Sequence, residues 1–172
     1  MAKSPNSLTP SWLSLLNPDP ETSHRLHTAG PGATRLARCG AGRDAIVMAP
    51  LQRGLAALDA LDLPVQDGYS VLADRSRQEL VVVVEDGWAH LWADTPGVRV
   101  LSEDAWLLVP VPGGDGTLAA AWLSTPERDV EDTWRAGDGV PSLGGVSAAV
   151  DARALREALA GVDRELAEVP AP

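Results

Sequence analysis

The chain has 172 residues, an apolar fraction of 45% and a single cysteine, so it is long enough to bury one core and cannot rely on internal disulfides. With 24 acidic and 14 basic residues its net charge is −10, which makes direct nucleic-acid binding by the main domain unfavourable because such binding depends on neutralising phosphates. The first thirty residues lack the apolar core of a signal peptide, and no apolar run is long enough to span a bilayer, so we expect a cytoplasmic protein with no membrane partner.

Residues 1–38 are rich in proline, serine, threonine and glycine, a composition that buries too little apolar surface to fold by itself. We therefore expect a flexible arm over this range. Within it, a short helix bounded by prolines presents Trp12, Leu15 and Leu16 on one side. These are candidate binding residues, because apolar anchors at this spacing dock either on their own domain or on a partner protein.

A single domain is predicted over residues 39–168, followed by a short tail at 169–172. Its first elements are a strand at 44–49 and a helix that starts after Pro50 and ends near Leu63. The helix carries one apolar stripe, which we expect to face the core and which consists of Leu51, Leu55, Leu58 and Leu61.

Five further strand candidates follow this helix, with turn residues between them. The strands at 69–74 and 79–85 flank a polar turn, which predicts an antiparallel hairpin. The strands at 98–101 and 105–111 flank three polar residues and predict a second hairpin. A last strand at 118–124 follows a glycine-rich turn.

Residues 125–150 are polar, glycine-rich and aperiodic, which indicates a long surface connection with Trp134 as its anchor. The final element is a helix with apolar residues at helical spacing, namely Leu155, Leu159, Val162 and Leu166. Strands in one run with helices before and after them indicate an α+β fold. We expect a largely antiparallel sheet of about five to six strands, with an N-terminal and a C-terminal amphipathic helix packed on it.

Residues 81–90, VVVVEDGWAH, run from four valines into two acids and a histidine. Four consecutive valines indicate a central strand covered on both faces, and the acids indicate where it emerges into solvent. Because adjacent side chains of a strand point to opposite faces, Glu85 and Asp86 are not expected to bind one metal or one substrate together. The alternative is a catalytic cluster of Glu85, Asp86, Asp74 and His90.

His24 and His27 have an H-x-x-H spacing, and Cys39 follows twelve residues later. Zinc would need a fourth ligand and a fixed geometry, which a flexible arm does not provide. The sequence also has no Walker loop, no G-x-S-x-G elbow and no C-x-x-C pair. We therefore predict neither a metal nor a cofactor.

Six tryptophans with one tyrosine and no phenylalanine form an unusual aromatic set. Trp106 and Trp122 lie within strand patterns and are expected in the core. The others, in loops or at element ends, are Trp12, Trp88, Trp92 and Trp134. They act either as aromatic plugs over a small core or as exposed anchors for a partner, because tryptophan is enriched among interface hot spots.

The segments CGAGRDAIVMAPLQRGLAALDAL, SVLADRSRQELVVVVEDG, PGVRVLSEDAWLLVPVP and AAAWLSTP follow one another along the chain. Together they resemble small actinobacterial proteins described as bifunctional DNA primase/polymerase N-terminal-like, over about residues 39–168. The catalytic family of that name uses an acid-x-acid pair on one strand and a nearby histidine to hold metals for nucleotidyl transfer. The strands here offer only the adjacent Glu85 and Asp86, so the resemblance assigns no catalytic residue.

These observations favour a non-catalytic cytoplasmic binding or regulatory module that acts through protein–protein interaction. The arm, or the 125–150 connection with Trp134, would carry that contact. Two alternatives remain open at this stage: a primase-polymerase-like domain for nucleotide binding or nucleotidyl transfer, and a structural subunit that assembles with itself.

Overall fold

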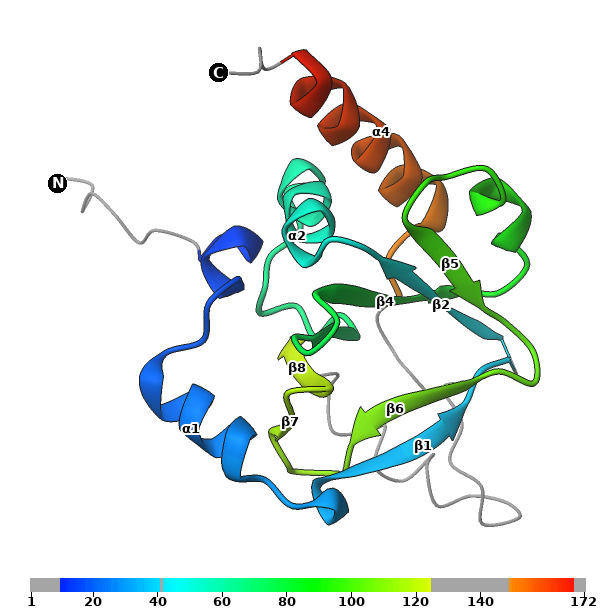
Figure 1. Cartoon of the computed structure of the whole chain (residues 1–172). Coiled ribbons are helices and arrows are strands. Elements are labelled where there is room, and N and C mark those ends of the chain that lie inside the picture. Colours follow the sequence, from blue (N-terminus) through cyan, green and yellow to red (C-terminus); the bar gives the residue numbers. More distant parts are fainter. Residues whose placement is uncertain (1–9, 41, 125–148, 169–172) are drawn as a thin grey trace, which may run out of the picture.

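The computed structural model describes residues 10–40, 42–124 and 149–168 (Figure 1). The described elements are η1 (Trp12–Leu15), α1 (Pro20–Thr28), η2 (Pro31–Ala33), β1 (Thr34–Arg38), β2 (Arg43–Met48), α2 (Leu51–Ala60), β3 (Val71–Asp74), β4 (Glu79–Glu85), η3 (Ala89–Trp92), β5 (Val98–Leu101), β6 (Trp106–Pro110), β7 (Gly116–Thr117), β8 (Ala120–Ser124) and α4 (Ala152–Glu168), where η denotes a 3-10 helix. The predicted α+β class is confirmed.

The main sheet has six strands in the order β5-β2-β4-β3-β8-β7, and every neighbouring pair is antiparallel. β4 lies between β2 and β3, as its four valines predicted. Val82 and Val84 belong to the core cluster on the helical side of the sheet, whereas Val81 and Val83 belong to a second cluster on the other side. Both faces of this central strand are therefore covered.

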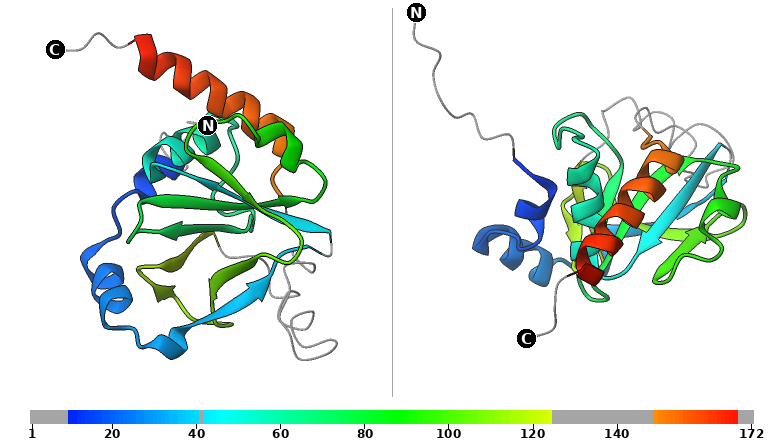
Figure 2. Two further views of the ribbon diagram at one scale, coloured as in Figure 1. Left: turned by 45° about the vertical axis from the view of Figure 1, so that its right-hand side comes forward. Right: turned by 90° about the horizontal axis from the view of Figure 1, so that it is seen from above.

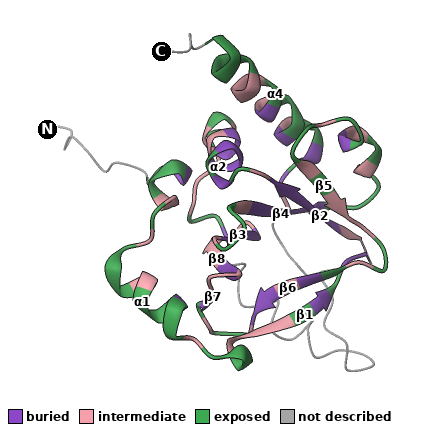
Figure 3. Cartoon of the chain, viewed as in Figure 1, coloured by how far each residue is buried: buried purple, intermediate pink, exposed green. Residues whose placement is uncertain are grey.

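α2 and α4 pack together on one face of the main sheet (Figure 2). The first apolar residue of the stripe is fully buried in both helices, Leu51 in α2 and Leu155 in α4. The guanidinium of Arg53 joins the two helices through a two-pronged contact with Asp163, at 2.6 and 2.7 Å. The prediction that Leu166 belongs to the buried stripe of α4 is wrong. The helix extends beyond the sheet at its C-terminal end (Figure 3), and Leu166 is 61% exposed.

The other face of the main sheet is covered by a two-stranded ribbon in which β1 pairs with β6. β1 leads along the chain to β2, and β5 leads to β6, so the chain passes twice between the ribbon and the main sheet. Both connections turn at a common corner. Gly40 and Asp104, with φ of 97° and 68°, lie at this corner. Glycine takes such a conformation without the steric penalty that a Cβ imposes.

The predicted hairpin between 98–101 and 105–111 is wrong, because β5 pairs with β2 and β6 pairs with β1. The three polar residues between β5 and β6 make a bend between two layers instead of a chain reversal. The prediction failed because β1, which supplies the partner of β6, lies in the range expected to be a flexible arm.

Residues 10–38 differ from that expectation, since they form η1, α1, η2 and β1. The carboxylate of Asp19 caps α1 by accepting the Thr22 N–H at 2.9 Å, and Pro20 occupies the first helical turn. Leu26 is the buried side chain of α1. Composition alone missed these elements because contacts with the rest of the chain, and not internal burial, stabilise them.

No helix in the described part of the chain combines the length and the apolar composition needed to cross a membrane.

Candidate functional site

The short helix η1 is docked on this chain's own domain. The Trp12 indole is 1% exposed and donates its Nε1–H to the Leu63 carbonyl at 2.8 Å. The backbone N–H groups of Trp12 and Leu13 donate to the two carboxylate oxygens of Asp59 on α2, at 2.5 and 3.0 Å. Leu15 and Leu16 are half-buried against the same core. In this conformation three of the predicted binding residues serve intramolecular packing.

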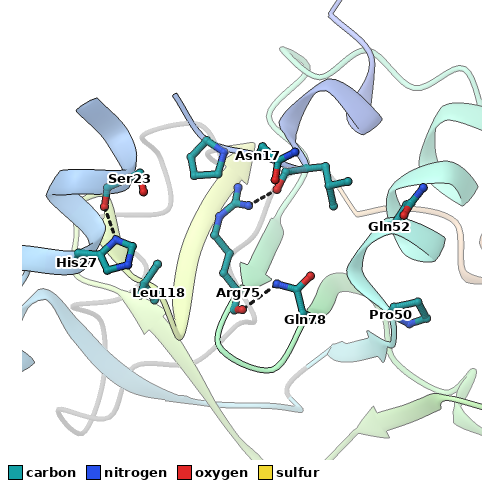
Figure 4. Close-up of a pocket in the computed structure, with 10 residues that line it drawn as sticks. Asn17, Ser23, His27, Pro50, Gln52, Arg75, Gln78 and Leu118 are labelled. Atoms are coloured by element: carbon teal, nitrogen blue, oxygen red, sulfur yellow. Dashed lines mark hydrogen bonds between the residues drawn. The ribbon is translucent and has the colours of Figure 1, made fainter. Parts of the chain in front are cut away.

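Arg75, the residue after β3, binds the C-terminal end of η1. Its guanidinium donates to the carbonyl of Leu15 at 2.9 Å and to the carbonyl of Leu16 (Figure 4). Beneath this contact lies a cavity of about 330 Å³ between the arm and the body, which we call the arm cavity. Its lining residues are Leu16, Asn17, Pro18, Ser23, His27, Pro50, Gln52, Arg75, Gln78 and Leu118.

Trp134, the fourth predicted binding residue, lies outside the described residues, as does most of the 125–150 connection.

The four residues of the alternative catalytic cluster do not come together. Asp74 ends β3 opposite Glu79, where its carboxylate accepts the Ser76 hydroxyl and the Arg77 N–H. Glu85 lies at the other end of β4, roughly 20 Å away at the usual rise per strand residue. Asp74 therefore closes a turn at the opposite end of the sheet from the other three residues.

Asp86 and His90 do share a cleft, but Glu85 is not part of it. This corner cleft, of about 330 Å³, lies where the ribbon bends away from the main sheet. Its lining residues are Gly40, Asp44, Asp86, Gly87, Ala89, His90, Ser102 and Glu103. The two consecutive acids thus diverge, and Asp86 meets residues of β2 and the β5–β6 bend.

Asp44, which the sequence analysis did not single out, is the buried acid of this cleft, with 4% of its surface exposed. Burial raises the pKa of its carboxyl, and the nearby charge of Asp86 raises it further. The Gly87 N–H and the Ser102 hydroxyl donate to the carboxylate and oppose part of that shift in pKa. An acid placed at the start of the apolar run DAIVM is the signal that could have identified it.

The corner cleft gathers acidic side chains and a histidine around the buried Asp44. Among residues 10–40, 42–124 and 149–168, no group of three acidic, histidine or cysteine side chains is placed to hold a metal. Cys39 is buried in the ribbon-side cluster, and burial raises the pKa of its thiol to about 11, so it is protonated at neutral pH. His24 and His27 lie instead on the exposed surface of α1.

The ribbon carries an exposed apolar surface on its outer side. Leu36 is 55% exposed and Trp106 is 49% exposed, which corrects the expectation that Trp106 is in the core. Leu36 lies directly opposite Leu108, and Trp106 is the next residue on the same face of β6. We call these three residues the ribbon surface. Trp122, by contrast, packs partly buried against the ribbon-side cluster.

A cleft of about 390 Å³ adjoins the ribbon surface and separates the ribbon from the main sheet. Its apolar lining comes from both layers and includes Val47, Leu72, Val81, Leu101 and Leu107, together with all three ribbon-surface residues. Charged side chains border it, and two of them form a two-pronged ion pair, Arg99 with Glu79. An apolar cleft with a few fixed charges is the usual form of a binding site.

Comparisons of the chain with protein-family models, with curated proteins and with solved structures found no match in any of the three. The resemblance to primase/polymerase N-terminal-like proteins therefore stays a prediction, and the function must be argued from the geometry.

Proposed function

We propose that this protein is a protein-binding module whose contact site is the ribbon surface with the open edge of β1. The observation that supports this most is the exposure of Leu36 and Trp106 side by side beside an apolar cleft. Trp106 is half exposed and lies next to the cleft, and tryptophan is one of the residue types enriched among interface hot spots. The arm is not the proposed contact, because Trp12 is already buried in its own core.

The open edge of β1 defines the kind of partner. The Val111 N–H donates to the Ala33 carbonyl and the Cys39 N–H donates to the Ala105 carbonyl. In an antiparallel pair the bonded residues alternate, so the N–H and C=O groups of Thr34, Leu36 and Arg38 point away from β6. Among the described residues no strand pairs with this edge.

The partner that fits is a protein segment in extended conformation. Such a segment adds to the edge of a sheet through backbone hydrogen bonds, and its alternate side chains give specificity. Apolar side chains at alternate positions of the segment would pack on Leu36 and Trp106 at the mouth of the cleft. Nucleic acid is disfavoured by the net charge of −10, because phosphates are repelled at long range.

The test is a selection of linear peptides on the immobilised full chain from a random display library, followed by fluorescence anisotropy with the enriched peptides. We expect the enriched peptides to have apolar residues at alternate positions. Trp106→Ala should weaken their binding about 30-fold, which corresponds to ~2 kcal/mol for a typical hot spot. Because Trp106 is exposed, the variant should keep the circular dichroism spectrum of the wild type.

Leu166→Ala is the matched control, since Leu166 is also an exposed apolar residue but lies on α4, and this variant should change the affinity less than about twofold. Failure to enrich any peptide, or equal binding by Trp106→Ala, would refute the proposal. Light scattering tests whether the ribbon surface binds a second copy of this chain instead of another protein. A molar mass of a dimer for the wild type and of a monomer for Trp106→Ala would assign the surface to self-association.

A further inference from the structure

We infer that the arm cavity binds a small oxyanion, a carboxylate or phosphate group, between the N-terminal arm and the body. This inference does not depend on the proposed protein-binding function, because the arm cavity and the ribbon cleft share no lining residue. The charge of the cavity lining is the first observation that supports it. In a chain of net charge −10, the lining of this cavity contains an arginine and a histidine and no acid.

Arg75 has donors left for an anion. Two of its N–H groups are used by the carbonyls of Leu15 and Leu16, while its Nε is buried and has no hydrogen-bond partner. Burial also lowers the pKa of this guanidinium, which reflects the cost of holding its charge away from water. An oxyanion would supply both the missing acceptor and the missing counter-charge.

The other polar groups of the cavity complement an oxyanion. Gln78 donates one amide N–H to the main-chain carbonyl of Arg75 at 2.9 Å, which holds its side chain in the lining of the cavity (Figure 4). The His27 Nδ1 lies 2.8 Å from the Ser23 carbonyl, which can only accept, so Nδ1 donates its proton there and this N–H is not available to a ligand. Asn17 and Gln52 add further amide donors to the lining.

Two acids of the neighbouring cavity are already engaged. Asp19 and Asp115 do not line the arm cavity but a neighbouring cavity, which shares Asn17, Pro18 and Arg75 with it. The Asp19 carboxylate accepts both the N–H and the hydroxyl of Thr22, and Asp115 forms an ion pair with Arg25 at 2.7 Å. Neither carboxylate is hydrogen-bonded to Arg75 in these contacts.

The volume and position of the cavity set the size and the effect of the ligand. About 330 Å³ is at the lower end of the range for small-molecule sites, so the cavity fits an inorganic anion with water or a small metabolite. The walls come from both the arm and the body. A bound anion would bridge the two, so its binding would stabilise the docked arm by mass action.

The test is a titration of the full ¹⁵N-labelled chain by nuclear magnetic resonance with sodium phosphate, sodium acetate and sodium citrate, against sodium chloride at equal ionic strength. We expect saturable shifts of the Arg75 Nε–H and Gln78 side-chain amide signals with phosphate or with a carboxylate, and no saturation with chloride. The salt that saturates at the lowest concentration distinguishes a phosphate ligand from a carboxylate ligand.

Two variants with unchanged arm contacts complete the test. Gln78→Glu adds a negative charge to the lining of the arm cavity and should weaken anion binding at least tenfold, whereas Arg156→Gln removes a positive charge from the exposed face of α4 and should change it less than twofold. Absence of saturable shifts with all three oxyanions would overturn the inference. Equal binding by Gln78→Glu would overturn it as well, since the shifts would then arise elsewhere.

Discussion

Asp44 is buried at the corner where β2 leaves the ribbon, and it faces the carboxylate of Asp86 across a small cleft. Burial comes first and the Asp86 charge second among the causes that raise its pKa. The folded protein therefore binds a proton at Asp44 more tightly than the unfolded chain does. Through linkage, the ionisation of this one side chain costs folding free energy.

Asp44→Asn should reveal this cost as a pH dependence. The contribution of Asp44 to stability is largest below its usual pKa of 3.8 and is lost as the pH rises through the higher pKa of the folded state. The difference in free energy of unfolding between Asp44→Asn and wild type should therefore shift in favour of the variant as the pH rises from 3 to 7. Urea unfolding followed by tryptophan fluorescence measures it.

Asp86→Asn provides the internal check, because it removes only the second cause of the raised pKa. It should reproduce the sign of the effect with a smaller size. A difference between Asp44→Asn and wild type that does not change with pH, or that changes in the opposite direction, would contradict this description of the corner cleft.

Among the elements, α2 shows how closely the helical layer packs on the main sheet. Gly54 faces β4 at a point where an added Cβ would lie 2.7 Å from one Leu80 methyl carbon and 2.9 Å from its Cβ. Leu80 is fully buried and cannot move aside. Gly161 on α4 is the opposite case, since the nearest heavy atom to its added Cβ is 4.0 Å away on the Arg164 guanidinium.

The same glycine-to-alanine change should therefore have opposite effects at these two positions. Gly54→Ala gains about 1 kcal/mol of helix propensity but loses about 1–3 kcal/mol to overpacking, so a net destabilisation of about 1 kcal/mol is expected. Gly161→Ala should stabilise by about 0.5–1 kcal/mol. Urea unfolding of both variants tests this, and a stabilising Gly54→Ala would show that the contact with β4 is looser than described.

Elements with strong periodicity were predictable, and elements that depend on distant partners were not. The predicted strands at 79–85 and 98–101 coincide with β4 and β5, because alternation and β-branched residues mark them locally. β1 has no such signal: only Ala37 of its five residues is buried, and β6 is what stabilises it. Missing β1 also produced the wrong hairpin.

The candidate sites show the same division. Alternation separated Glu85 from Asp86, and the structure places only Asp86 in a cleft. Asp44 was not singled out, because the sequence does not show that β2 pairs with β4 and so brings Asp86 beside it. Trp106 was expected in the core for a similar reason: a tryptophan in a strand pattern does not reveal which face of the strand a second layer will cover.

The whole molecule consists of three layers, with helices α2 and α4 on one face of the main sheet and the bent ribbon on the other (Figures 1 and 2). The two buried clusters account for both faces of the sheet. The outer side of the ribbon is covered by no described element and holds two of the four large apolar residues that the described chain exposes. This arrangement is the basis for proposing that a partner protein completes the ribbon.

Amide hydrogen exchange of the full chain with and without a saturating selected peptide tests this claim most directly. The Leu36 and Arg38 N–H groups point away from β6, so pairing with a partner strand should slow their exchange at least tenfold. Ala37, in a bonded pair with Leu107, is the internal control and should change little. Unchanged exchange at Leu36 and Arg38 while the peptide is bound would contradict strand addition at β1.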